Sequence, residues 1–182
     1  ICNEYFLAVG GIHPRKNILQ LLKAFSQFKK WQQSNMKLVI AGRLAWQYET
    51  FIEKLKSYKY RNDVVLTGYI NDNTLADLMG SAYALVYPSL FEGFGVPIIE
   101  AMQSGTPVIT SNTSSMPEVG GDAVLYANPS DVDDLAKQMM LIYKDENLRN
   151  NLIEKGLIRA KQFSWDASAE ELWRQIEIIA KK

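Results

Sequence analysis

The sequence predicts an α/β domain with a doubly wound, Rossmann-like parallel sheet of about six strands and helices on both faces. Short apolar runs alternate along the chain with longer segments in which apolar residues recur at helical spacing. This alternation requires crossover connections between parallel strands. Gly10 and Gly42 follow the first two apolar runs directly, which suits strands that end in tight turns.

The predicted strands are short and apolar over nearly their whole length. This is typical of parallel strands that helices cover on both faces. In chain order they are Tyr5–Val9, Lys37–Ala41, Val64–Thr67, Ala82–Tyr87, Val108–Thr110 and Ala123–Tyr126.

The segments between the strands carry apolar residues on one helical face. The first helix follows Pro14–Asn17 and presents Ile18, Leu21, Leu22, Phe25 and Phe28. Further helices are expected at Tyr48–Tyr58, after a cap at Asp72 or Asn73, and from near Pro97 to Gly105. From Asp131 to the end the chain is expected to be helical in pieces. Met139 and Met140 lie in this last part and are expected in the core.

Composition sets the limits within which function must be sought. A length of 182 residues fits one domain, residues 1–182, and 20 basic against 20 acidic residues give no long-range field for nucleic acid or an anionic membrane. The single cysteine, Cys2, fits a reducing compartment, so we expect a cytoplasmic protein. No apolar run approaches the roughly 20 residues of a membrane helix. The chain starts without Met just before a strand, so it is expected to be a piece of something larger.

The most informative stretch runs from Tyr87 to Pro107. Glu92 and Glu100, 100 − 92 = 8 residues apart, bracket the turn Gly93-Phe94-Gly95. Glycines let backbone N–H groups approach a ligand, and the helix start near Pro97 favours an anion. Glutamates on either side can accept hydrogen bonds from hydroxyl groups. This combination suits a nucleotide sugar.

Polar residues also follow the other predicted strands. Because ligands in open α/β sheets bind beyond the carboxyl ends of the strands, these residues should meet at one edge. Cations beside a glycine turn and a helix start would form a diphosphate site. In strand order they are Arg15 and Lys16, then Arg43, then Tyr69 and Ile70, then Glu92 to Val96, then Ser111 to Ser115.

Several motifs in order give the chain a family resemblance that covers most of its length. They are Gly10-Gly-Ile-His-Pro-Arg-Lys-Asn17, Ala41-Gly-Arg43, Thr67-Gly-Tyr69, the Glu92–Glu100 stretch, Gly105-Thr-Pro-Val-Ile109 and Ser111-Asn-Thr-Ser-Ser-Met-Pro-Glu118. Together they resemble the retaining nucleotide-sugar glycosyltransferases of the group 1 or family 4 type, which include sucrose synthases and bacterial mannosyltransferases. The resemblance implies the two-domain GT-B architecture, with this chain as the C-terminal donor-binding half and the N-terminal acceptor domain absent.

The resemblance also implies a role for each matching residue. Glu100, expected in the first turn of its helix, would accept hydrogen bonds from the ribose, and Glu92 with the turn would hold the donor sugar and phosphate. Lys16 would pair with the diphosphate. The catalytic residues would be Glu92, Lys16 and Arg15, and the donor-binding residues Gly11, Arg43, Tyr69, Ile70, Leu75, Gly93, Phe94, Gly95, Val96 and Glu100.

One position departs from the family pattern. Many relatives carry an arginine directly after the first glycine, and here that position is Gly11. Arg15 or Arg43 could supply the missing charge, and the sequence leaves that choice open.

The chemistry implied is retaining hexosyl transfer without a metal or a cofactor, since no Asp-x-Asp pair follows a strand. The motif Ala-Gly-Arg-x-x-Trp-x-Tyr resembles bacterial enzymes that build surface polysaccharide, and favours GDP-mannose as the donor and a glycan or lipid-linked acceptor. The expected partners are a nucleotide sugar and the missing half of the enzyme. Nucleic acid is not expected, any membrane contact would involve only the missing half, and the isolated domain should be nearly inactive.

Three other functions are alternatives to glycosyl transfer. A dehydrogenase would need G-x-G-x-x-G after the first strand, and the chain has Gly-Gly-x-x-Pro. A nucleotide-sugar epimerase of the same architecture would need catalytic carboxylates and a histidine that the sequence does not identify. A non-catalytic nucleotide-sugar-binding domain remains an alternative, although the intact glutamate pair argues against it.

The single histidine and the four tryptophans are not expected to take part in the chemistry. His13 lies in the loop expected near the phosphates, but it has no second ligand or triad partner of its own, so a chemical role is not expected. Trp31, Trp46, Trp165 and Trp173 are expected to pack inside the domain, with Trp46 the weakest case.

Overall fold

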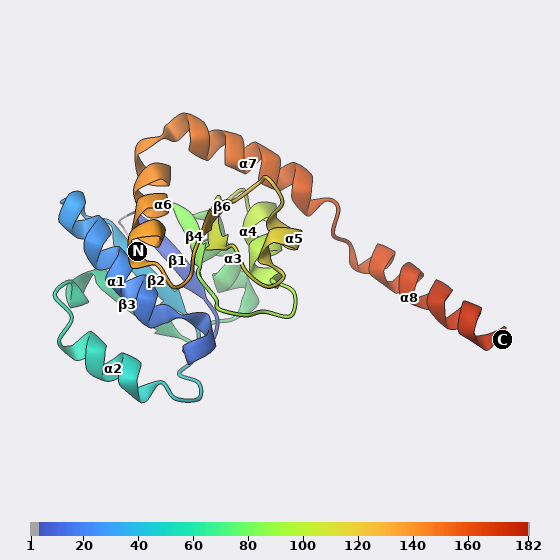
Figure 1. Cartoon of the computed structure of the whole chain (residues 1–182), viewed down its shortest axis with the longest axis horizontal. Helices are drawn as coiled ribbons and strands as arrows, with labels where there is room; N and C mark the ends of the chain where they lie inside the picture. Colours follow the sequence, from blue (N-terminus) through green and yellow to red (C-terminus); the bar gives the residue numbers. More distant parts are fainter. Residues whose placement is uncertain (1–3, 182) are drawn as a thin grey trace.

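The computed structural model describes residues 4–181, and within them the chain forms a six-stranded sheet with helices on both faces (Figure 1). Every strand pairs in parallel with its neighbours, in the order β3-β2-β1-β4-β5-β6. The strands are β1 Tyr5–Val9, β2 Lys37–Ala41, β3 Val64–Gly68, β4 Ala84–Tyr87, β5 Val108–Ser111 and β6 Leu125–Ala127. The predicted fold class is confirmed.

Two predicted strands begin too early. The fourth begins at Ala84 and not at Ala82, because the N–H of Ala82 bonds to Met79 O and closes the end of the preceding helix. The sixth begins at Leu125 and not at Ala123, whose N–H bonds to Gly120 O in a turn. Apolar composition alone does not separate these turn residues from the strand that they lead into.

The helices between the strands largely match the predicted segments. In chain order they are η1 Pro14–Lys16, α1 Ile18–Trp31, α2 Glu49–Lys56, η2 Arg61–Asp63, α3 Asp72–Gly80, α4 Val96–Gln103, α5 Met116–Gly120, α6 Val132–Lys144, α7 Glu146–Ala160 and α8 Trp165–Ala180.

Two details of the helices differ from the prediction. The cap of α3 is Asn71, whose side chain accepts the N–H of Thr74 at 2.9 Å, and not Asp72 or Asn73, which lie inside the helix. Helix α5 was not predicted, because its five residues are too few to show a helical period.

The strands send alternate side chains into two apolar layers. Phe6, Leu38 and Ile40 face α1, α2 and α6, while Leu7 and Val39 face α3, α4 and α5. Met139 is fully buried in the first layer and Met140 packs against it, which confirms the predicted core placement. Helix α7 crosses the domain and lies against α4, where Gly156 lets the two helices approach at Met102 (Figure 1).

Three glycine-containing turns join at the carboxyl edge of the sheet, after β1, β2 and β3. The N–H of Gly10 bonds to Ala41 O, and the N–H of Gly42 bonds to Gly68 O. A Cβ added to Gly42, at φ 155°, would lie 2.1 Å from Gly10 O. This contact requires glycine, and it holds the loop after β1 in place.

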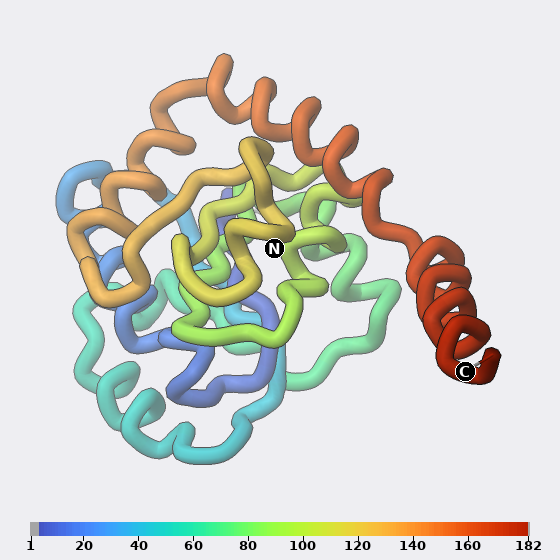
Figure 2. Tube along the Cα trace, turned by 45° about the vertical axis from the view of Figure 1, so that its right-hand side comes forward, coloured from blue at the N-terminus to red at the C-terminus, as the bar shows by residue number. Residues whose placement is uncertain are grey.

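Helix α8 is the exception to the compact packing. It points away from the body, and Figures 1 and 2 both show it extending beyond the end of α7. The expectation that the four tryptophans pack inside the domain was wrong: Trp31, Trp46, Trp165 and Trp173 are between 46% and 86% exposed. Trp165 and Trp173 belong to α8, Trp31 ends α1, and Trp46 lies in a surface loop.

A search of the described residues for a helix that is long and apolar enough to cross a membrane finds none.

The close approach at Gly42 yields a stability test. We expect Gly42→Ala to lower the free energy of unfolding by about 1–3 kcal/mol, because a methyl group cannot fit against the backbone of Gly10. Gly93→Ala is the control, since no atom lies within 4 Å of a Cβ added there. It should change stability by no more than about 0.5 kcal/mol. Urea unfolding of both variants measures the difference, and equal stabilities would contradict the proposed contact.

Candidate functional site

The site lies where the strand order reverses, between β1 and β4. From β1 the chain winds outward through β2 and β3, and from β4 it winds the other way through β5 and β6. The loops that follow β1 and β4 therefore meet at one point of the carboxyl edge, where the N–H of Leu90 bonds to Arg15 O at 2.9 Å. Doubly wound sheets bind ligands in the crevice at such a point. Lys16 follows β1 and Glu92 follows β4, so the two predicted residues face the same crevice.

Lys16, Arg15 and Glu92 form one charged cluster in this crevice. Lys16 Nζ lies 2.8 Å from Glu92 Oε1, and Arg15 Nη1 pairs with Glu92 Oε2. Arg15 also donates to Phe91 O at 2.8 Å, and Lys16 to the Tyr87 hydroxyl at 2.6 Å. Two cations and one carboxylate leave the cluster with a net charge of +1. It is therefore suited to an anion.

Glu92 is ionised in this setting, because its partners outweigh its burial. Its side chain is only 10% exposed, and burial by itself would raise its pKa. The hydrogen bonds and charges of Lys16 and Arg15 instead hold the pKa of Glu92 below the usual value for a glutamate. Burial, and then Glu92, raise the pKa of Tyr87, so its hydroxyl stays protonated beside Lys16.

The Gly93–Gly95 turn is held by serines that follow β5. Ser114 Oγ donates to Glu92 O at 2.7 Å, and Ser115 Oγ donates to Phe94 O at 2.6 Å. Gly95, at φ 113°, precedes the first residue of α4, and no side chain caps that helix start. The first backbone N–H groups of α4 therefore have no side-chain acceptor, and a helix N-terminus of this kind favours an anion. Sequence reasoning placed these serines at the edge but missed their role as supports.

Glu100 lies one residue deeper in α4 than predicted. The helix begins at Val96, so Glu100 is its fifth residue and not part of its first turn. Burial, followed by the charge of Asp72, raises the pKa of Glu100 above its usual value. Among residues 4–181, no donor bonds to its carboxylate. Glu100 is a half-buried acceptor without a protein partner, and Asp72 places it beside the start of α3.

The residues expected around the base follow β3, next to Glu100. Tyr69 is 79% exposed, while Ile70 and Leu75 are half-buried and pack against the second apolar layer. Their role around the base stays a prediction.

Arg15 and Arg43 were the two candidates for the positive charge that is missing at Gly11, and they lie in different surroundings in this structure. Arg15 joins Lys16 at Glu92, whereas the side chain of Arg43 is exposed and only its backbone oxygen is engaged, by Ile12 N–H at 2.9 Å. Gly11 lies beside this second segment, where an added Cβ would be 3.1 Å from Ala45 Cβ. Among the residues described, Arg15 is the arginine that joins the charged cluster.

His13 has a structural role in the same loop. Its Nδ1 accepts the N–H of Arg15 at 3.1 Å and caps the short η1 helix. It thereby helps to fix the backbone that carries Arg15 and Lys16.

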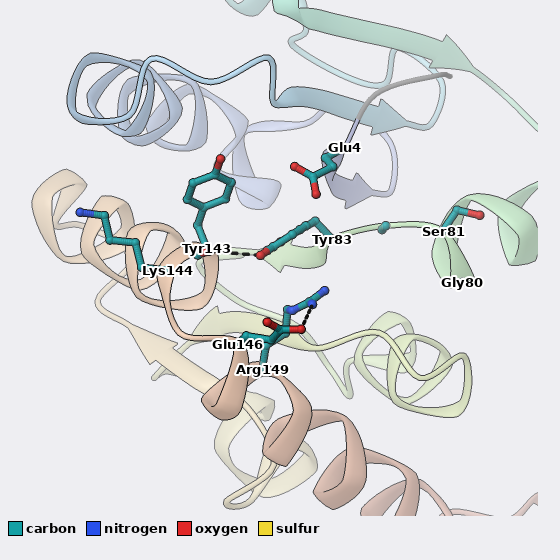
Figure 3. Close-up of a pocket in the computed structure, with 9 residues that line it drawn as sticks. Glu4, Gly80, Ser81, Tyr83, Tyr143, Lys144, Glu146 and Arg149 are labelled. Carbon is teal, nitrogen blue, oxygen red and sulfur yellow. Dashed lines mark hydrogen bonds and ion pairs between the residues drawn. The ribbon is translucent and has the colours of Figure 1, made fainter.

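A cavity of about 590 Å³ lies at the opposite, amino edge of the sheet (Figure 3). Its lining includes Glu4 and Glu146 as well as Lys144 and Arg149, so its charges compensate one another. The guanidinium of Arg149 stacks 4.6 Å from the ring centroid of Tyr83 and lies 3.9 Å from Glu146. The cavity is remote from the charged crevice, and the topology favours the crevice as the functional site.

Within residues 4–181, no group of three or more His, Cys, Asp or Glu residues is placed to hold a metal ion.

Comparison with known proteins defines the family. The family model described as "Glycosyl transferases group 1" matches residues 3–159. The chain belongs to this family. The match covers each residue of the crevice described above, from Gly11 to Ser115.

Proteins named as bacterial mannosyltransferases are among the relatives of this chain. The chain is 38% identical over 162 residues to the O-antigen chain mannosyltransferase B of Escherichia coli, a match that covers 89% of this chain and 42% of that protein. It is 32% identical over 180 residues to the mannosylfructose-phosphate synthase of Agrobacterium fabrum, covering 94% of this chain and 40% of that protein. The chain thus spans less than half the length of these relatives.

Solved structures of GT-B glycosyltransferases share the fold. The sucrose-phosphate synthase of Thermosynechococcus elongatus superposes with a TM-score of 0.86 at 27% identity, covering 98% of this chain and 46% of that chain. WaaG, a glycosyltransferase involved in lipopolysaccharide biosynthesis, superposes with a TM-score of 0.77 at 21% identity, covering 89% and 44%.

The Glu92 cluster predicts a pH-dependent contribution to stability. A carboxyl whose pKa is lowered on folding stabilises the protein above its unfolded pKa, and this stabilisation is lost as pH falls through the folded pKa. We expect Glu92→Gln to lower the free energy of unfolding by about 1.5–3 kcal/mol at pH 7, because two cations lose a charged acceptor. Urea unfolding should show the gap closing as pH falls below the pKa of Glu92. A gap that persisted unchanged in acid would mean that the ion pairs do not stabilise the fold.

Proposed function

We propose that this chain is the donor-binding domain of a retaining mannosyltransferase, which binds a nucleotide-diphosphate sugar, GDP-mannose in the first place. The observation that carries the proposal is the Lys16–Glu92–Arg15 cluster beside the Gly93–Gly95 turn, with the unpartnered Glu100 along the same crevice. Mannosyl donors are favoured because the relatives named as mannosyltransferases match across this whole region. The acceptor would be a glycan or a lipid-linked sugar, and we infer a cytoplasmic reaction.

The proposed chemistry follows from the charge of the cluster. As the bond between the anomeric carbon and the diphosphate oxygen breaks, negative charge grows on the departing nucleoside diphosphate. Lys16, Arg15 and the N–H groups at the start of α4 would stabilise that charge without a metal ion, because they are already oriented toward it. The acceptor hydroxyl would attack the anomeric carbon on the same face, and its proton would leave with the departing diphosphate. The anomeric configuration would then be retained.

Glu92 has two parts in this scheme. Before the donor binds, Glu92 holds Lys16 and Arg15 in the crevice, because each cation is paired with one of its carboxylate oxygens. When a diphosphate competes for the two cations, the carboxylate oxygens of Glu92 become available to hydroxyl groups of the sugar. Glu92 would therefore contact the donor sugar, as the family pattern implies.

The acceptor half of the enzyme is part of the proposal. The chain spans 42% of the E. coli mannosyltransferase and 46% of the sucrose-phosphate synthase chain. We infer that an N-terminal half completes the crevice in the whole protein, and that the isolated domain binds donor but transfers sugar very slowly. An epimerase or a non-catalytic binding domain would be distinguished by incubating the whole protein with labelled donor, which would yield an epimerised donor in the first case and no reaction in the second.

The diphosphate assignment is tested by comparing ligands. We expect the chain to bind GDP at least tenfold more tightly than guanosine, because charge-assisted hydrogen bonds to Lys16 and Arg15 are the strong ones. Lys16→Met should remove most of that difference, while Lys155→Met, a surface lysine paired with Asp122, should leave it intact. Isothermal titration calorimetry measures each affinity. Equal affinities for GDP and guanosine would contradict the assignment.

Metal independence has its own test. Because no carboxylate cluster of the described residues is placed to hold a cation, EDTA should leave the GDP affinity unchanged. A loss on chelation that magnesium restored would show a metal-bridged diphosphate.

Substitution of Glu100 shows whether this residue binds the ribose or only stabilises its helix. Its raised pKa means that the charged form is disfavoured by folding, so Glu100→Gln should leave stability at pH 7 equal or slightly higher. The same change should weaken GDP binding by about tenfold or more, because bonds to a charged acceptor cost about 1.5–3 kcal/mol to lose. It should also reduce the preference for GDP over 2′-deoxy-GDP.

The matched control is Glu146→Gln, which alters a first-turn glutamate at the opposite edge of the sheet. It should not affect either nucleotide. If Glu100→Gln binds both nucleotides like the parent chain, the ribose does not contact Glu100.

A further inference from the structure

The chain between β4 and the glycine turn is fixed by hydrogen bonds around Ser89. Ser89 O accepts the hydroxyl group of Ser111 at 2.6 Å, and the N–H of Leu90 bonds to Arg15 O at 2.9 Å. The first bond comes from β5 and the second from η1. The backbone at Ser89 is therefore held in one position, and its side chain starts from a defined point.

Ser89 is fully buried, yet its hydroxyl group forms no hydrogen bond within residues 4–181. The residue is 0% exposed, and no partner lies in hydrogen-bonding geometry to its Oγ. Burying a hydroxyl group without a partner is unfavourable, and folded proteins keep few such groups. An alanine would fill almost the same space without this penalty. The hydroxyl group therefore has to be explained by something other than packing.

An acceptor in the same condition lies next to it. Glu92 Oε1 is buried and also lacks a well-aligned hydrogen bond among the residues described, although Lys16 Nζ lies 2.8 Å away. Burial raises the pKa of Glu92, whereas Lys16, the Ser89 hydroxyl group and then Arg15 lower it, so the hydroxyl group is close enough to act on the carboxylate. A buried donor and a buried acceptor are thus neighbours, and in the free chain the carboxylate is paired with the two cations instead.

Binding of a diphosphate changes the surroundings of this carboxylate. In the proposed function the phosphates compete for Lys16 and Arg15, which are the charged groups that face Glu92 in the described part of the chain. A carboxylate that is only 10% exposed and loses its cations is strongly disfavoured unless another donor replaces them. Two neutral donors remain beside it, the hydroxyl groups of Ser89 and Tyr87. Tyr87 is bonded to Lys16 at 2.6 Å, whereas the Ser89 hydroxyl group is available.

We propose that Ser89 is a positioning residue, whose hydroxyl group donates to the carboxylate of Glu92 when a diphosphate takes up Lys16 and Arg15. The new bond keeps Glu92 ionised and fixes the direction in which it meets the hydroxyl groups of the donor sugar. Ser89 itself does not touch the donor and acts through Glu92 alone. This inference rests on the proposed function and deepens it, because it names the group that replaces the two cations.

Calorimetry of the chain with GDP and with GDP-mannose tests the proposal, because the ratio of the two affinities isolates the contribution of the sugar. Ser89→Ala should reduce the affinity for GDP-mannose relative to GDP by roughly tenfold, the equivalent of one hydrogen bond to a charged group. The affinity for GDP itself should not change. The melting temperature of the free chain should stay equal or rise, since the hydroxyl group forms no bond there.

Thr110→Val is the matched control, because it also removes a fully buried hydroxyl group beside this segment. Thr110 donates to Tyr87 O at 3.0 Å, so its loss should lower the melting temperature and leave the ratio of affinities unchanged. The pH dependence of the ratio is a second readout. In Ser89→Ala the preference for GDP-mannose should decline at a higher pH than in the parent chain, because Glu92 then protonates more readily. A hydroxyl group that only supported the fold would not move this profile.

The results that contradict the proposal can be told apart. A ratio that Ser89→Ala leaves unchanged, in a parent chain that binds GDP, would reject the role of Ser89 and retain the donor site. A melting temperature that falls as far as in Thr110→Val would show that the hydroxyl group is already bonded in the free chain, and would also overturn the proposal. If the parent chain binds neither GDP nor GDP-mannose, the proposed function fails and the role of Ser89 fails with it.

Discussion

The ion pairs between Glu92 and the cations Lys16 and Arg15 are the interaction on which the site depends. They join the loop after β1 to the loop after β4, which are 92 − 16 = 76 residues apart for the lysine pair. Without the carboxylate, two cations would repel each other in a half-buried crevice. With it, the site stays ordered, keeps a net positive charge and remains available to an anion.

The sheet makes that interaction possible. Reversal of strand order between β1 and β4 brings the loops after these strands to one point of the carboxyl edge, and backbone bonds among the glycine turns after β1, β2 and β3 fix the loop after β1. The serines after β5 then support the Gly93–Gly95 turn from the other side. Each loop of the carboxyl edge is therefore held by hydrogen bonds to a neighbouring loop, and these bonds fix the backbone that carries the charged side chains.

Glu92 and Glu100 show how one fold can give two glutamates different properties. Both are partly buried, but Glu92 has two cationic partners and Glu100 faces only Asp72. Folding thus lowers the pKa of one and raises that of the other. A carboxylate kept without a partner at some cost in stability is typical of a site that is completed by its ligand.

The sequence predicted most of the fold and much of the site, for identifiable reasons. The ends of strands β1 to β3 were predicted correctly or to within one residue. The apolar runs of β1 and β2 are too short for buried helices, and Gly10 and Gly42 mark where these two strands end. The convergence of Lys16, Arg15 and Glu92 followed from the rule on strand ends, since each lies just beyond one.

What was missed depended on contacts between distant residues. The early starts assigned to β4 and β6, the cap at Asn71 and the short helix α5 are decided by individual hydrogen bonds, which composition does not reveal. The tryptophans were expected to pack because they fall at helical or loop positions, yet Trp165 and Trp173 are exposed on α8, which has no buried residue among those that the structure describes. No local pattern distinguishes an apolar residue that is buried in the domain from one that stays exposed.

The central claim is that the β1–β4 crevice is the nucleotide-sugar site, and a crystal structure of the chain with bound GDP tests it most directly. We expect the β-phosphate within hydrogen-bonding distance of Lys16 Nζ and of the N–H groups at the start of α4, with the ribose hydroxyls on Glu100. GDP bound instead at the amino edge, against Arg149 and Lys144, would contradict it.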